Sequence, residues 1–276
     1  MPDKSLVMNQ KIHAIKFRVT QNYQRFFSKV NESPTIILGN QKSGTSAIVS
    51  LLGEAANKSY SNDIFVWHYG LESKVFEKKM PFEDFVDKAR YHFSKDFIKD
   101  PSLTFMFEEL SARFPNSKYV FVIRNPLDNI RSILNRLQLP GDLKDLDESH
   151  FTQVLRDRPL WMPVITGQGN GWTEGNYIER LAHRCRIALE LCHQHPTRWI
   201  TIRYEDFVKQ KHITIENTLK ELGIPVQADI SSIVDKPFQP KGDTNIAAED
   251  FFSPENIEKI IDICGPIMHH HGYAQN

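Results

Sequence analysis

The sequence has few cysteines, no net charge and no long apolar runs, and each shortage excludes a class of protein. Its three cysteines form no CxxC pair and no even-numbered framework, so we expect a reducing, cytoplasmic location. The 34 Lys and Arg residues balance the 34 Asp and Glu residues, so the basic excess of a nucleic-acid-binding protein is missing and no nucleic-acid partner is expected. No apolar run approaches the roughly 18 residues of a membrane span, and the first residues lack the apolar core of an export signal.

What is present is typical of a folded globular protein. Hydrophobic residues make up 40% and charged residues 25% of the 276 residues, which excludes wholesale disorder. A chain of this length buries roughly three quarters of its unfolded surface, so it needs neither a disulfide nor a structural metal in order to fold.

The first 32 residues differ from the rest. Residues 4–31 contain six Lys and Arg residues and no acid, and apolar residues recur at helical spacing, which predicts a basic amphipathic helix before a domain of residues 33–276. The favoured interpretation is that this helix packs on the domain. The alternative is that it lies on a membrane surface. The apolar stripe consists of Ile12, Ile15, Val19, Tyr23, Phe26 and Val30.

After residue 33 the chain alternates apolar strands with amphipathic helices. Such alternation predicts a single α/β domain with a mostly parallel sheet, because parallel strands need helical crossovers. The stretch 138–176 is polar and irregular, and we expect it to form part of an acceptor pocket or its lid. The expected strands are 35–39, 96–100, 118–124 and 199–204, and the expected helices are 45–56, 103–114, 126–137, 177–195, 214–222 and one beginning near 254.

The segment 39–46, with the sequence GNQKSGTS, joins a buried strand to a helix. A glycine-rich loop in this place points backbone N–H groups at an anion, and the helix N-terminus adds positive potential. The segment resembles the Walker A phosphate loop, but its lysine is Lys42 rather than the residue after Gly44. The clearest expected strand, 118–124, ends in Arg124 rather than in an aspartate that would hold magnesium. The loop therefore predicts a site for a phosphate-type anion, without ATP and magnesium.

A second motif, RNPLDNIRS at residues 124–132, follows the apolar strand KYVFVI. Ligands of parallel sheets bind at the carboxyl ends of the strands, where Arg124 would offer a bidentate fork. Ser132 lies about two helical turns further on, and its hydroxyl could bind the same anion.

The two motifs together resemble the sulfotransferases that use 3′-phosphoadenosine 5′-phosphosulfate (PAPS). The resemblance implies an α/β fold with a P-loop-like loop, and transfer of a sulfuryl group from PAPS to a hydroxyl or amine of a glycan, lipid or small molecule. It also implies PAPS as co-substrate and no metal. For the 5′-phosphosulfate it assigns the loop residues Gln41, Lys42, Ser43, Gly44, Thr45 and Ser46, with Lys42 stabilising charge on the bridging oxygen. It further assigns Arg124 and Ser132 to the 3′-phosphate, Tyr204 to adenine, and Lys241 of a C-terminal loop to the 3′-phosphate.

Two departures from the family pattern bear on the catalytic base. Ala47 stands where enzymes acting on phenols and steroids carry a tryptophan, and the segment Ile98–Ser102 lacks their histidine. The chain is more similar to bacterial and carbohydrate-directed members, in which a glutamate after the first helix is the base. Here the candidates are Asp63 and His68, with Asp100 behind them, while Lys99 would orient the sulfuryl group.

Two other functions compete with this one. The first is a P-loop nucleoside-triphosphate kinase, which the position of Lys42 disfavours. The second is a scaffold that binds the nucleotide without catalysis, which the sequence leaves open because the base is the least certain feature.

Overall fold

The computed structural model describes residues 26–64, 70–236 and 247–273. The expected basic helix lies almost entirely outside these residues, as do His68 and Lys241. In the described part of the chain, no helix is both long and apolar enough to cross a bilayer.

The core of the protein is a five-stranded parallel sheet in the order β2-β3-β1-β4-β5, which confirms the expected α/β class. All carboxyl ends therefore lie at one edge of the sheet, and β1 and β4 are flanked on both sides. The short β2 was not expected, because three residues are too few to show a pattern. The strands are β1 (Thr35–Gly39), β2 (Tyr60–Asn62), β3 (Phe97–Lys99), β4 (Lys118–Ile123) and β5 (Trp199–Arg203).

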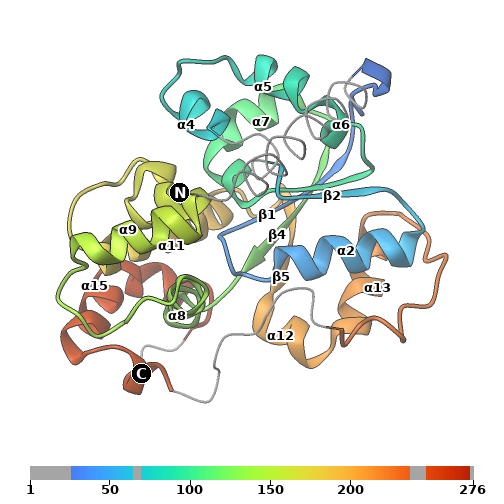
Figure 1. Ribbon diagram of the computed structural model, residues 1–276. Helices are drawn as coiled ribbons and strands as arrows, with labels where there is room; N and C mark the ends of the chain where they lie inside the picture. The colour runs from blue at the N-terminus through green and yellow to red at the C-terminus, as the bar shows by residue number, and fades with distance from the viewer. Residues whose placement is uncertain (1–25, 65–69, 237–246, 274–276) are drawn as a thin grey trace, which may run out of the picture.

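Helices cover both faces of the sheet, as Figure 1 shows, with α2 and α13 on one side and α8, α11 and α15 on the other. The described α-helices are α2 (Thr45–Ala56), α4 (Leu71–Phe76), α5 (Phe82–Lys88), α6 (Arg90–Phe93), α7 (Phe107–Arg113), α8 (Pro126–Leu137), α9 (Glu148–Asp157), α10 (Met162–Ile165), α11 (Tyr177–Gln194), α12 (Tyr204–Lys209), α13 (Lys211–Glu221), α14 (Ala248–Phe251) and α15 (Pro254–His270). Three 3-10 helices, η1 (Pro101–Met106), η2 (Pro159–Trp161) and η3 (Gln168–Asn170), complete the set.

Strand β4 shows why the sheet has two separate cores. Its side chains alternate, so that Tyr119 and Phe121 join the core beneath α8, α11 and α15. Val120 and Val122 join the smaller core beneath α2 and α13. A strand buried on both faces has no polar positions, which is why it was readable as a continuous apolar run.

Two expected segments need correction. The stretch 138–176 is not irregular throughout, because it contains α9, α10, η2 and η3, and Asp147 begins α9 with a capping box. The expected helix 103–114 begins as η1 and continues as α7. The Asp100 side chain accepts a hydrogen bond from the Ser102 amide, and Pro101 fixes the first position of the tighter turn.

Candidate active site

The phosphate loop lies at the carboxyl edge of the sheet, between β1 and α2. Gly44 is the N-cap residue of helix α2, and no side chain caps the first turn of the helix. The first amide groups of a helix have no partner within the helix, so an uncapped N-terminus leaves N–H donors for an anion. The local geometry therefore matches the expected anion site.

Two glycines allow the loop to approach its neighbours closely. A Cβ atom at Gly39 would lie 2.5 Å from the carbonyl oxygen of Val122, and one at Gly44 would lie 2.4 Å from Cδ2 of Tyr204. Both residues also have positive φ angles, 140° and 100°. The ring of Tyr204 thus packs directly on the loop.

Lys42 occupies the left-handed region, with φ of 66°, which costs a non-glycine residue roughly 1–2 kcal/mol. Burial, followed by the neighbouring cations Arg136, Arg124 and Lys99, lowers the pKa of its ammonium to about 8, and Asp63 opposes the shift. Several cations therefore gather around one carboxylate. A polyanionic ligand would relieve their mutual repulsion.

Arg124 connects the loop to the expected adenine residue. Its Nη1 atom donates to the carbonyl oxygen of Lys42 at 2.6 Å, and its guanidinium lies over the Tyr204 ring at 4.4 Å. Its Nε atom is buried and has no hydrogen-bond partner within the described residues. The structure thus brings together Lys42, Arg124 and Tyr204, which lie far apart in the sequence.

Ser132 lies on α8, one turn before Arg136. Ser132 is half-buried, and no hydrogen bond joins it to the loop within the described residues. Burial, together with the charge of Arg136, lowers the pKa of Lys42, so this cation lies near the loop. Sequence reasoning missed Arg136, although its spacing of four residues from Ser132 places both on one helix face.

Lys99 joins three elements at the same edge. Its Nζ atom donates to Ser46 Oγ at 2.8 Å and to Asp63 Oδ1 at 2.6 Å, while its side chain is only 3% exposed. The Asp63 amide donates to the Lys99 carbonyl oxygen at 2.9 Å. The ends of β2 and β3 and the start of α2 are therefore held together by expected site residues.

Two further carboxylates lie close to this edge. Asp100 is buried, and its Oδ1 atom accepts from the Ser102 amide at 2.9 Å, so its carboxylate is committed to starting η1. The hydroxyl of Ser102 donates to Glu72 Oε1 at 2.6 Å, and burial raises the pKa of Glu72. Glu72 was not singled out from the sequence, because an isolated glutamate on a short helix carries no motif.

Glu205 supports the site from the side of β5. Its Oε1 atom accepts from the Asn125 amide at 2.8 Å, next to Arg124, and its Oε2 atom accepts from the Tyr273 hydroxyl at 3.2 Å. Arg203 holds the same end of the chain by donating to the carbonyl oxygens of His271 at 2.7 Å and Gly272 at 3.2 Å. The last described residues are thereby tied to the start of α8.

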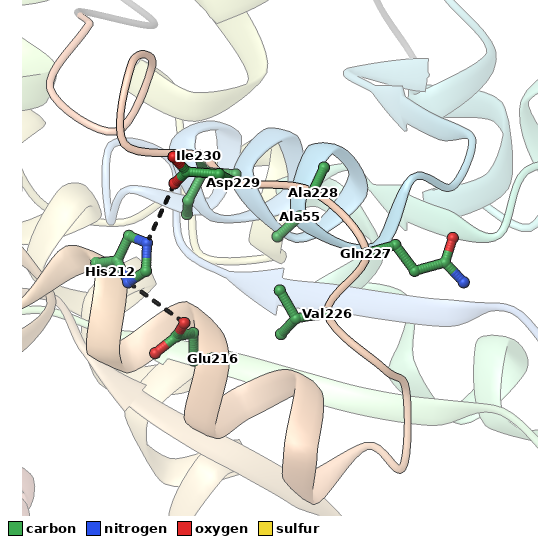
Figure 2. Close-up of a pocket in the computed structure, with 8 residues that line it drawn as sticks. All are labelled: Ala55, His212, Glu216, Val226, Gln227, Ala228, Asp229 and Ile230. Atoms are coloured by element: carbon green, nitrogen blue, oxygen red, sulfur yellow. Dashed lines mark ion pairs between the residues drawn. The ribbon is translucent and has the colours of Figure 1, made fainter.

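A separate hollow of about 320 Å³ lies away from the loop, between α13, the C-terminal part of α2 and the segment 226–230 (Figure 2). The wall of the hollow includes Ala55. At a rise of 1.5 Å per residue, Ala55 lies about 15 Å along α2 from Thr45, the first residue of the helix. His212 lies between Glu216 at 3.5 Å and Asp229 at 3.8 Å. These contacts join segment 226–230 to α13 and are not part of the anion site.

Comparison with known proteins decides the family. The model of the sulfotransferase family matches residues 56–228, well over half of the chain. The chain belongs to the sulfotransferase family. The matched region of this sulfotransferase includes Asp63, Lys99, Arg124, Ser132 and Tyr204, whereas the phosphate loop lies just before it. Enzymatic sulfuryl transfer, expected from the motifs, is thereby confirmed.

Two mycobacterial sulfotransferase structures agree on the fold. Sulfotransferase STF9 from Mycobacterium avium has a TM-score of 0.57 at 12% identity, over 95% of this chain and 82% of that one. STF1 from Mycobacterium tuberculosis has a TM-score of 0.50 at 10% identity, over 88% and 80%. Mouse SULT7A1, solved with PAP, has a TM-score of 0.48 at 13% identity, over 88% and 86%. No curated protein matches the chain in sequence.

Proposed function

We propose that this sulfotransferase uses PAPS as its donor, transfers the sulfuryl group to an acceptor hydroxyl or amine, and releases 3′-phosphoadenosine 5′-phosphate (PAP). The observation that carries the proposal is the junction of Arg124, the Lys42 carbonyl and the Tyr204 ring at an uncapped helix N-terminus. It offers amide donors, fixed cations and an aromatic face, which correspond to the phosphosulfate, the 3′-phosphate and the adenine of the donor.

On the 5′ side, the amides of residues 44–46 would hold the phosphosulfate, with the side chain of Gln41 supporting the loop. The amide and hydroxyl of Ser43 already donate to the Asn40 carbonyl oxygen, at 3.2 and 2.7 Å, so Ser43 would shape the loop. Sulfuryl transfer resembles phosphoryl transfer, in which a loose transition state is stabilised mainly by positioning and electrostatics. The charge of Lys42 would oppose the negative charge that develops on the bridging oxygen as the sulfur–oxygen bond breaks.

On the 3′ side, the guanidinium of Arg124 and the hydroxyl of Ser132 would bind the 3′-phosphate. The buried Nε atom of Arg124, which has no partner within the described residues, supports this assignment, because a phosphate oxygen would satisfy it. Tyr204 would contact the adenine. Lys241 stays a prediction from the sequence, since it lies outside the described residues.

For the chemistry at the acceptor, we propose that Lys99 orients the sulfuryl group and that Asp63 takes the acceptor proton. The pairing of both with Ser46 at the mouth of the loop supports their participation. His68 stays the alternative base, outside the described residues. Asp100 is the weakest candidate, since its carboxylate already binds the Ser102 amide.

We further propose that the enzyme works without a metal ion, because Lys42, Arg124 and Lys99 supply the positive charge that a metal would otherwise provide. The three cysteines, Cys185, Cys192 and Cys264, are buried free thiols, which supports a reducing, cytoplasmic location. PAPS and the acceptor are the proposed partners. Membrane contact through residues 1–32 stays the less favoured alternative.

The test is a turnover assay with ³⁵S-labelled PAPS and a panel of glycan, lipid and phenol acceptors, together with calorimetry of PAP and of ATP with magnesium. We expect label transfer, and PAP should bind far more tightly than ATP, because charge-assisted bonds to the 3′-phosphate contribute about 1.5–3 kcal/mol each. Preference for ATP with magnesium would contradict the proposal and favour a kinase.

A further inference from the structure

Arg184 is a fully buried charged side chain next to the phosphate loop. It lies on α11 and is 0% exposed. Its Nε and Nη2 atoms donate to Gln41 Oε1 at 2.9 and 2.7 Å, and Nε also donates to Asn40 Oδ1 at 3.1 Å. The two residues that precede Lys42 are therefore both held by one guanidinium.

Asn40 and Gln41 are also held from other directions. The Gln41 amide donates to Asn40 Oδ1 at 2.9 Å, and Asn129 Nδ2 donates to the Gln41 carbonyl oxygen at 2.9 Å. Asn40 Nδ2 donates in turn to Asn129 Oδ1 at 2.8 Å. This network holds the loop from two helices, α8 through Asn129 and α11 through Arg184.

Burial of a guanidinium costs free energy, because the charge loses its hydration. Burial lowers the pKa of Arg184 to about 10, and the carboxylate of Glu72 opposes the shift. The ring of Phe105 packs on the guanidinium at 3.9 Å. Replacement of a whole buried ion pair by apolar residues of similar volume is often neutral or stabilising, so overall stability alone is a weak reason for a buried arginine and its polar partners here. A function in holding the loop is a stronger reason.

We infer that Arg184 is a positioning residue, which acts through Gln41 to hold the phosphate loop in the conformation that binds the donor. The inference rests on the proposed PAPS site. Lys42 adopts a left-handed conformation immediately after the two anchored residues, and such a conformation persists only where the surroundings enforce it. With the loop fixed in advance, binding does not have to order it.

The test compares Arg184→Met, Gln41→Met and the double variant by PAP calorimetry and thermal unfolding. Each single substitution should weaken PAP binding by at least about tenfold, which equals about 1.4 kcal/mol. The double variant should bind PAP at most about threefold more weakly than the single variant with the lower PAP affinity. Both substitutions remove the same hydrogen bonds between Arg184 and Gln41, so their effects should not add. Multiplying losses would overturn the inference, as would PAP affinity within about twofold of wild type in Arg184→Met.

Arg113→Met is the control for a merely structural arginine. Arg113 forms ion pairs with Glu32 and Glu83, both at 2.6 Å, at the surface. Its loss should lower the melting temperature while PAP affinity stays unchanged. If Arg184→Met does not fold, Gln41→Glu decides the question, since it keeps an acceptor for Arg184.

In that case Gln41→Glu should bind PAP more tightly than Gln41→Met by at least about fivefold. Equal affinities of the two variants would overturn the inference. Failure of the wild-type protein to bind PAP would instead contradict the proposed donor site, so the two failures are distinguishable.

Discussion

At the scale of single residues, Lys42 makes the chemistry depend on pH. Burial and neighbouring cations lower its pKa to about 8, so the free enzyme loses this positive charge as the pH rises above that value. We expect kcat/KM for PAPS to fall above about pH 8, because this ratio reports groups of the free enzyme. The bound donor is negative and holds the proton, so kcat should fall only at higher pH.

Lys42→Arg provides the control for this profile, since a guanidinium keeps its proton throughout. The variant should be slower and should lack the decline above pH 8. The same decline in Lys42→Arg would show that another group titrates.

Asp63 gives a second prediction at this scale. Asp63→Asn removes the charge at nearly constant volume, and loss of a general base should lower kcat by roughly 10²–10⁴ while PAP affinity changes little. Asp96→Asn is a matched control, because Asp96 precedes the other end of β3 and pairs with Lys58 at 3.0 Å. Full activity in Asp63→Asn would show that Asp63 is not the general base, and His68 would then be the candidate.

Residue contacts also show the limit of sequence reasoning. Lys42, Arg124 and Tyr204 were found because each belongs to a local motif at the end of a strand. Arg184 and Asn40 are 144 positions apart and meet only through the packing of α11 on the sheet. No spacing in the sequence announces such a contact, because the fold alone brings the two residues together.

At the scale of elements, the junction of loop and helix is the most constrained point. Gly44→Ala would place a Cβ atom 2.4 Å from the Tyr204 ring at a φ of 100°, so both the ring and the first turn of α2 must shift. We expect PAP affinity to fall by at least about tenfold, measured by calorimetry, because the amide donors of α2 move with the turn.

Gly223→Ala separates the effect of a positive φ angle from the effect of the clash with the Tyr204 ring. Gly223 follows α13 with a φ of 68°, and its nearest contact for a Cβ atom is the Lys118 ammonium at an ordinary 3.7 Å. This variant should lose about 1 kcal/mol of stability from the backbone alone and bind PAP normally. Equal binding losses in both variants would contradict a specific effect at Gly44.

The elements themselves were predictable in proportion to their length and burial. Strand β4 and helix α8 showed clear apolar patterns, and the Asn125 side chain caps α8 just before Pro126. The three residues of β2 pair with β3 without any pattern of their own. Helix α9 was missed because its polar sequence buries only Val154.

At the scale of the whole molecule, Glu205 couples the end of the described chain to the donor site. Glu205→Ala would leave the Asn125 amide without its acceptor and free Tyr273. A fully buried unsatisfied donor costs about 1–3 kcal/mol, and because Asn125 is only half-buried the free energy of unfolding should fall by an amount at the lower end of that range. PAP affinity should fall as well, because Arg124 follows the position of Asn125.

Asp206→Ala is the control, since Asp206 is the next carboxylate in sequence and is exposed. Denaturant unfolding and PAP calorimetry of the two variants give the comparison. Unfolding curves of Glu205→Ala that overlay those of Asp206→Ala would remove the coupling.

The bonds of Arg203 and Glu205 to residues 271–273 also bear on the order of events during protein synthesis. The phosphate loop is synthesised more than 200 residues before His271, Gly272 and Tyr273. Arg203 and Glu205 can bond to those three residues only after they have emerged from the ribosome. A chain whose residues 271–273 have not yet emerged lacks these contacts of Arg203 and Glu205. A ribosome-bound chain in which residues 271–273 are still inside the exit tunnel should retain PAP more poorly than one in which an added C-terminal linker carries them clear of the tunnel.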